Sequence, residues 1–180
     1  MDDEPTRTMR TDIVLSPFDS DPGEFVAAAQ IADGGGFDGV YTFDHFSGSV
    51  AGHDWSRDPF VLLGAAAAAT TRVRIGVLVA NMANRHPAQL ALASNTLQAL
   101  ASPDRVICGI GAGAGPGSKF AVEQEMVGAT LADAATRRAQ LVDTIAELRS
   151  IWAGTSVVRN VVDGTPPPKV IVGASSRATV

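Results

Sequence analysis

Segments with the pattern of short β-strands alternate along this chain with segments that have the pattern of α-helices. The strand segments are brief apolar runs bounded by glycine, proline or polar residues, and they are expected at residues 12–15, 37–43, 73–79, 106–110 and 169–172. The helical segments lie between them, at residues 22–34, 59–70, 87–100 and 131–153. Strict alternation of this kind predicts parallel strands joined by right-handed crossovers. It leaves two architectures open, a doubly wound open sheet and a barrel.

Three of the four predicted helices begin with the same device, a polar residue followed by proline. The pairs are Asp21–Pro22, Asp58–Pro59 and His86–Pro87. A polar side chain can cap the start of a helix, and proline fits its first turn. The last helix is predicted to start at a capping box formed by Thr130 and Asp133. The helix after His86 is expected to bury one apolar face, which is made up of Leu90, Ala93, Leu97 and Leu100.

The composition is typical of one soluble globular domain. Hydrophobic residues make up 46% of the 180 residues and charged residues 18%, so a packed core is expected over residues 11–180, preceded by a flexible leader at 1–10. The net charge of −5 and the scattered basic residues argue against a nucleic-acid binder. The longest run of low polarity, 59–69, is too short to cross a membrane, and the polar start is not a signal peptide. The lone Cys108, expected to be buried, fits a cytoplasmic location.

Polar and glycine residues follow the predicted strands at their C-terminal ends, the end at which parallel α/β folds bind ligands. Among them, the pair Asp44–His45 has the clearest chemistry, since a histidine there can give or take a proton beside a substrate. The alternative is a capping aspartate and a histidine bonded to nearby backbone. His53 is expected to face solvent and His86 to anchor a helix. No pair of histidines or carboxylates has metal-ligand spacing, so no metal site is predicted.

A glycine-rich loop follows the fourth predicted strand. Gly109, Gly111 and Ala114 loosely satisfy the dinucleotide-binding pattern G-x-G-x-x-A. That pattern needs a helix to open at once, and Pro116 and Gly117 delay it, so a Rossmann site is not supported. We expect the bare backbone of Gly111, Ala112 and Gly113 to lie against a flat ring instead.

Taken in order along the chain, these motifs resemble the luciferase-like flavin monooxygenase superfamily, and above all its branch that uses the deazaflavin coenzyme F-420. The resemblance covers residues 10–180. Its motifs are Gly36–Val40, Asp44–His45, Trp55–Phe60, Ala69–Gly76, Arg85–Ala88, Gly109–Gly113 and the helix from Arg137 to Trp152.

The resemblance implies a (β/α)8 TIM barrel of α/β class, with the cofactor ring across the C-terminal strand ends and a small organic substrate above it. His45 is then the proton-transfer residue and Asp44 a neighbour of the cofactor. A non-prolyl cis peptide behind the ring falls at Leu78–Val79, and Asn81 is a ring contact. The phosphate-binding loop falls at Gly173, Ala174, Ser175 and Ser176. Asp–His in place of Glu–His favours coenzyme F-420 over FMN, the alternative cofactor.

The chain departs from the family pattern in two respects. Sugar-phosphate dehydrogenases of this branch carry a glutamate where Ala114 stands here, which argues against that substrate class. Five strands are predicted, whereas a complete barrel has eight strands and typically needs about 250 residues. We therefore expect an incomplete, C-terminally truncated barrel that forms a homodimer or other oligomer. Two interpretations remain, an oxidoreductase with His45 as proton relay, or a non-catalytic remnant or subunit that a partner chain completes.

Overall fold

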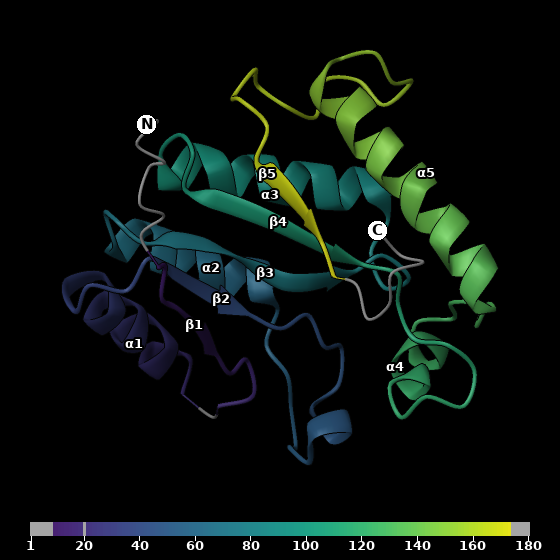
Figure 1. The fold of residues 1–180 in the computed structure, drawn as a ribbon, viewed down its shortest axis with the longest axis horizontal. Helices are drawn as coiled ribbons and strands as arrows, with labels where there is room; N and C mark the ends of the chain where they lie inside the picture. Colours follow the sequence, from purple (N-terminus) through teal and green to yellow (C-terminus); the bar gives the residue numbers. More distant parts are fainter. Residues whose placement is uncertain (1–8, 20, 174–180) are drawn as a thin grey trace, which may run out of the picture.

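The strands of the computed structural model form one parallel sheet in the order β1-β2-β3-β4-β5 (Figure 1). The structure describes residues 9–19 and 21–173; the predicted leader thus lies outside it except for Met9 and Arg10. The strands are β1 (Asp12–Leu15), β2 (Gly39–Thr42), β3 (Arg74–Asn81), β4 (Val106–Gly111) and β5 (Lys169–Val172). Each strand pairs with the next one in the sequence, without the reversal of order that a doubly wound sheet has. The barrel is therefore the right choice, with five of its strands described.

Helices connect the strands and cover one face of this sheet (Figure 1). They are α1 (Pro22–Gly34), α2 (Pro59–Ala69), α3 (Pro87–Ala101) and α5 (Ala134–Trp152). The short helix α4 (Ala121–Met126) lies in the connection between β4 and α5, and a 3-10 helix, η1 (Gly48–Ala51), lies in the connection between β2 and α2. Neither α4 nor η1 is predicted from the sequence, because each is too short to show a helical period.

The three cap-and-proline starts are confirmed. Asp21 accepts a hydrogen bond from the Gly23 N–H, and Asp58 accepts from Phe60 and Val61. The Nδ1 atom of His86 accepts from the N–H of Ala88 at 3.2 Å, so this histidine is the cap of α3. The predicted capping box at Thr130 is wrong. Asp133 is itself the cap, since its Oδ1 atom accepts from Thr136 N at 2.8 Å, and α5 begins one residue later.

The buried face of α3 differs from its predicted apolar face. Leu90 and Leu97 are buried, but Leu100 is 58% exposed. Polar side chains take its place, since Ser94 and Gln98 are fully buried. Both are satisfied: the Ser94 hydroxyl donates to Leu90 O at 2.6 Å, and Gln98 accepts from the N–H of Val106 on β4 at 3.2 Å. A hydrogen-bonded polar group can be buried at little cost, which an apolar periodicity cannot reveal.

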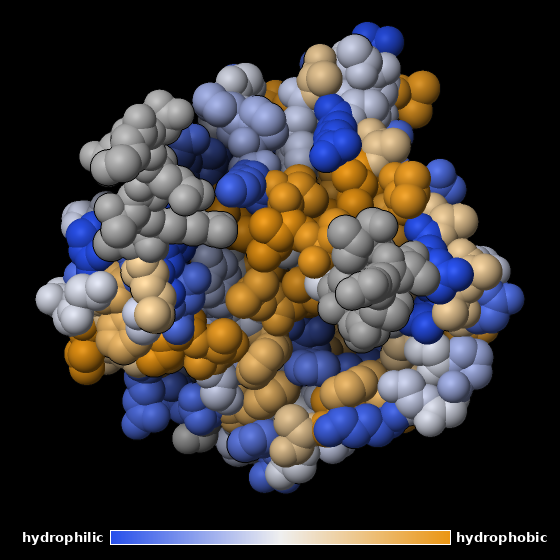
Figure 2. Space-filling view, viewed as in Figure 1, coloured by the Kyte–Doolittle hydropathy of each residue, from blue (hydrophilic) through white to orange (hydrophobic). Residues whose placement is uncertain are grey.

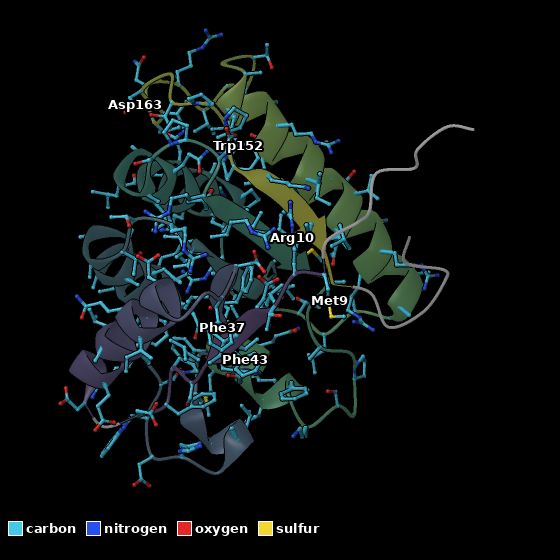
Figure 3. All side chains as sticks on the ribbon, turned by 60° about the vertical axis from the view of Figure 1, so that its left-hand side comes forward. Met9, Arg10, Phe37, Phe43, Trp152 and Asp163 are labelled. Atoms are coloured by element: carbon cyan, nitrogen blue, oxygen red, sulfur yellow. The ribbon has the colours of Figure 1, made fainter. Side chains whose placement is uncertain are left out.

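The helix α5 packs on α3 through its last residue. Trp152, labelled in Figure 3, donates from its indole nitrogen to the carbonyl oxygen of Ala91 at 3.2 Å. Leu141, Leu148 and Ile151 are the buried residues of α5, whereas Val142 is exposed. Among the described residues, no helix is long and apolar enough to cross a membrane.

Cys108 lies in the middle of β4 and is buried, as predicted. Burial raises the pKa of its thiol to about 12, so the group stays protonated at neutral pH. The residue therefore serves as a small apolar side chain of the core.

The opposite face of the sheet carries no helix, and apolar residues gather at its centre in Figure 2, which views the molecule as Figure 1 does. The sheet ends at β1 on one side and at β5 on the other. Val14 on β1 and Val172 on β5 are 42% and 41% exposed. Within the part of the chain that the structure describes, the sheet is open and its two edge strands carry unpaired backbone groups.

Candidate functional site

A cavity of about 800 Å³ lies at the C-terminal ends of the strands. It is the place at which barrel enzymes carry their active sites. Nine of the residues singled out from the sequence line it, namely Asp44, His45, Leu78, Val79, Asn81, Gly111, Ala112, Gly113 and Gly173. Ala174, Ser175 and Ser176 lie outside the described residues. Four strand ends that are far apart in the sequence therefore meet around one hollow.

The imidazole of His45 is held by a buried carboxylate. Its Nδ1 atom lies 2.8 Å from Oε2 of Glu123, and the side chain of Glu123 is only 1% exposed. The other carboxylate oxygen accepts a hydrogen bond from the N–H of Ser47, also at 2.8 Å. The ring of Phe120 stacks on the imidazole at 5.2 Å between centroids. His45 thus has a fixed orientation, in which its Nδ1 atom is bonded to Glu123.

Sequence reasoning did not find Glu123. It lies on α4, a short helix after the glycine-rich loop, and its contact with His45 spans 78 positions of the chain. No short pattern in the sequence signals this contact.

Asp44 is buried, and its carboxylate is used inside the protein. Arg85 binds it through two hydrogen bonds of 2.8 Å, and Asn81 donates its backbone N–H at 3.0 Å. Arg85 also donates to Asp58, the cap of α2, at 2.9 Å and lies over the ring of Phe60. Burial opposes the charge of Arg85, but the two carboxylates outweigh it and raise the pKa of this guanidinium above its usual value. Asp44 therefore lines the cavity as half of an ion pair.

The wall of the cavity on β3 is a bulge. The register between β3 and β4 shifts between Val77 and Ala80, and the peptide bond Leu78–Val79 is cis, at the position that the family resemblance implies. Two glycines leave room for this bulge, Gly111 at the end of β4 and Gly173 directly after β5. A Cβ atom at Gly111 would lie 2.6 Å from Cγ2 of Val79, and one at Gly173 would lie 3.1 Å from the same side chain. These glycines let the backbone of β4 and of the residue after β5 approach the bulge. Packing within the chain therefore explains why glycine stands at both positions.

The glycine-rich loop is held from α4 and α5. Gly113 has a φ of +72°, which only glycine adopts readily, and a Cβ atom there would lie 2.6 Å from Oε1 of Gln124. That oxygen accepts the N–H of Ala114, and Arg137 donates to the carbonyl oxygen of Gly113 at 2.7 Å. Arg137 also borders a second cavity of about 520 Å³ between this loop and α5. Sequence reasoning missed both Gln124 and Arg137 as residues that shape the site.

The remaining histidines lie elsewhere. His53 is exposed and stacks on Phe18, with ring centroids 5.0 Å apart. His86 caps α3, as described above. Over residues 9–19 and 21–173, no group of three or more His, Cys, Asp or Glu side chains could hold a metal ion.

The cavity suits a flat aromatic cofactor. Its volume lies in the range of small-molecule sites, and its wall combines apolar side chains such as Leu78, Val79 and Phe43 with exposed loop backbone. Phe43, at the end of β2, is labelled in Figure 3. The apolar side chains can cover a ring face, and the loop N–H groups can bond its polar edge.

Comparison with known proteins gives two kinds of relatives. An F420-dependent glucose-6-phosphate dehydrogenase from Beutenbergia cavernae is 35% identical over 147 residues, which are 80% of this chain and 40% of that protein. Another, from Kineococcus radiotolerans, is 34% identical over 135 residues, which are 73% of this chain and 37% of that protein. The chain thus spans about 40% of the length of these curated relatives.

Solved structures extend the likeness to the fold. An F420-dependent secondary alcohol dehydrogenase in complex with an F420–acetone adduct has a TM-score of 0.75 at 24% identity, over 91% of this chain and 52% of that one. Monooxygenase RslO1 from Streptomyces bottropensis has a TM-score of 0.72 at 24% identity, over 93% and 54%. The five strands therefore correspond to about half of these proteins. Since residues 6–180 match the family of luciferase-like monooxygenases, the chain belongs to that family.

Proposed function

We propose that this chain carries the cofactor-side half of an oxidoreductase that transfers a hydride between coenzyme F-420 and a small organic substrate, with FMN as the alternative cofactor. The observation that carries the proposal is the convergence of His45, the β3 bulge and the glycine-rich loop on one cavity at the strand ends. The curated relatives named above are F420-dependent, which supports the deazaflavin as the first choice.

Each part of the cavity then has a role. The cofactor, when bound, supplies the hydride chemistry, and the protein positions it. Leu78, Val79, Asn81 and the segment from Gly111 to Gly113 line the cavity. Leu78 and Val79 would cover one face of the ring, and Asn81 and the glycine-rich backbone would border its edge. Gly173 leads into Ala174, Ser175 and Ser176, whose N–H and hydroxyl groups would hold the cofactor phosphate. Asp44, paired with Arg85, keeps the end of β2 in position beside the ring.

His45 would exchange the proton that accompanies the hydride. Its ring lines the cavity, its Nδ1 atom is bonded to Glu123, and Nε2 is the nitrogen that remains for the substrate. A histidine is suited to this task because its proton can be given or taken near neutral pH. We propose a small alcohol or carbonyl compound as substrate. Ala114 stands where the sugar-phosphate enzymes carry glutamate, so we do not extend the sugar phosphate of the relatives to this chain.

A second candidate is a subunit that becomes active when another polypeptide segment closes the barrel. Over the described residues, β1 and β5 are open edges of the sheet with Val14 and Val172 exposed on them, which favours this arrangement. In that case the chain would be found as a dimer or other oligomer in the cytoplasm.

Titration of the purified chain with coenzyme F-420 and with FMN tests both candidates. Cofactor fluorescence measures binding, and light scattering after size-exclusion chromatography measures the oligomeric state. Micromolar binding of coenzyme F-420 by a monodisperse protein supports the first proposal. Binding that appears only when a polypeptide with the remaining strands is added supports the second, and an aggregated chain without binding under either condition contradicts both.

A further inference from the structure

We infer that Glu123 is a positioning residue that holds His45 in the tautomer with its proton on Nδ1, so that Nε2 is the acceptor for the proton of an alcohol substrate. The first part of this inference concerns the chain alone. The second part rests on the proposed function.

With Glu123 as a carboxylate, the hydrogen-bond pattern leaves one assignment for the protons. The backbone N–H of Ser47 can only donate, so Oε1 of Glu123 must accept from it. An ionised carboxylate has no hydrogen to donate, so at Oε2 the donor is Nδ1 of His45, 2.8 Å away. Glu123 is 1% exposed, and its two oxygens thus each receive one N–H group. These bonds replace the solvation that the buried carboxylate has lost.

The surroundings keep the pair in this geometry. Phe120, the residue before α4, stacks on the imidazole with an interplanar angle of 25°, and the ring of Phe18 is tilted against the imidazole with centroids 5.8 Å apart. The bond from Ser47 ties Glu123 to the loop that follows His45. Rotation of the ring would break the bond to Glu123 and leave a buried carboxylate with one unsatisfied oxygen, which is costly.

The consequence for chemistry is a direction of proton flow. In the oxidation of an alcohol, a bound deazaflavin or flavin would supply the oxidant: the hydrogen of the C–H bond and the electron pair of that bond would pass to it as hydride, and it would be reduced. The O–H bond breaks as well, its proton passes to Nε2 of His45, and the alcohol carbon and oxygen form a carbonyl group. The imidazolium that results keeps its Nδ1–H bond to Glu123, whose negative charge stabilises it. An acid that orients a catalytic histidine in this way is a general device of proton-transfer sites.

The substitution Glu123→Gln tests the inference sharply. The glutamine has one accepting oxygen, which must face the N–H of Ser47, so its NH₂ group faces Nδ1 of His45. Nδ1 must then accept, and the ring proton moves to Nε2. Nitrogen-15 NMR of the full chain with labelled histidine distinguishes the two tautomers, and a spectrum of His45→Gln assigns the signal. Spectra are recorded at a pH at which the ring carries a single proton.

We expect the Nδ1–H tautomer in the parent chain and the Nε2–H tautomer in Glu123→Gln. The matched control is Glu125→Gln, an exposed position on the same helix, which should leave the tautomer unchanged. A parent chain with its proton on Nε2 overturns the inference, and so does a tautomer that is the same in the parent and in a folded Glu123→Gln chain. The parent measurement stands even if the variant does not fold.

Activity gives an independent readout. With coenzyme F-420 and a secondary alcohol, Glu123→Gln should lower kcat by roughly 10²-fold or more, with the Kd for the cofactor unchanged. Absence of cofactor binding in the parent chain would contradict the proposed function but not the tautomer. An unchanged kcat in Glu123→Gln, alongside a switched tautomer, would refute the role of Glu123 in proton transfer.

Discussion

Arg85 binds the buried carboxylate of Asp44 through both of its oxygens, at 2.8 Å each, and so joins the loop before α3 to the end of β2. The same guanidinium reaches Asp58 at the start of α2. One cation thus holds together three loops at the rim of the cavity. Because the partner carboxylate is 5% exposed, the pair belongs to the buried class, in which the loss of one member leaves an uncompensated charge.

We therefore expect Arg85→Ala to lower the free energy of unfolding by about 3 kcal/mol, measured by urea denaturation. The control is Arg74→Ala, which removes an ion pair with Asp12 whose side chains are 23% and 37% exposed. That change should cost less than about 1 kcal/mol. Equal losses in the two variants would contradict a special role for the Asp44–Arg85 pair.

Local signals in the sequence were sufficient for the alternation of strands and helices along the chain, the starts of α1, α2 and α3, and the position of His45. A cap followed by proline acts within one turn, and the strand alternation follows from the chain itself. The partners of His45 and Asp44 were not predictable in this way. Glu123 and Arg85 reach them across 78 and 41 positions, through packing that no short pattern encodes.

The start of α5 shows the same limit on a smaller scale. Thr130 and Asp133 have the spacing of a capping box, and both are good capping residues. The backbone of Asp133 is extended and its side chain accepts from Thr136, so the later residue caps the helix. Two candidates three positions apart can be separated only by backbone geometry.

Asp33 makes stability depend on pH. Burial alone would raise its pKa, but the N–H groups of Thr71, Val73 and Arg72 outweigh burial and hold this pKa at about 2, below the ordinary value of 3.8. The folded chain therefore binds fewer protons than the unfolded chain between these values, so the contribution of Asp33 is present above pH 4 and is lost as the pH falls toward 2. Asp33→Asn should destabilise the chain by about 1 kcal/mol at pH 7.

Urea denaturation of both chains between pH 7 and the lowest pH at which they fold measures this effect. The difference between Asp33→Asn and the parent should shrink as the pH approaches 2. Asp163→Asn is the control, because Asp163 is exposed and its hydrogen bonds to Thr165 lie within its own loop, so its loss should change stability little. A difference for Asp33→Asn that is constant over the whole pH range would contradict the prediction.

His45→Ala removes the group that we propose for proton transfer. Once turnover with coenzyme F-420 and an alcohol is established, this variant should lower kcat by roughly 10²-fold or more, since general acid–base catalysis commonly contributes that much. His53→Ala is the matched control: His53 is exposed and stacks on Phe18, and its loss should leave kcat within twofold or so of the parent. A similar rate in the parent and in His45→Ala would remove His45 from the mechanism.

The contact between Gly111 and Val79 gives a prediction about the shape of the cavity. A methyl group at position 111 would lie 2.6 Å from Cγ2 of Val79. Val79 is β-branched and stiff, so it cannot turn aside cheaply. Gly111→Ala should therefore destabilise the chain by about 1–3 kcal/mol, as overpacking does, and weaken cofactor binding because the wall at Leu78–Val79 is displaced. Urea denaturation and fluorescence titration with coenzyme F-420 measure the two effects.

The double variant Val79→Ala with Gly111→Ala separates this clash from other consequences of a side chain on β4. Removal of the valine methyl groups frees the space that the new methyl group needs, so the double variant should regain most of the stability that Gly111→Ala loses, and the two changes should be non-additive. Gly64→Ala is the control for a glycine with open space. Gly64 lies on α2, and a Cβ atom there would meet nothing within 4 Å. It should stabilise the chain by about 1 kcal/mol, because alanine is the better helix former. Additive losses in the double variant would mean that Gly111 is required by something other than the approach of β4 to the bulge.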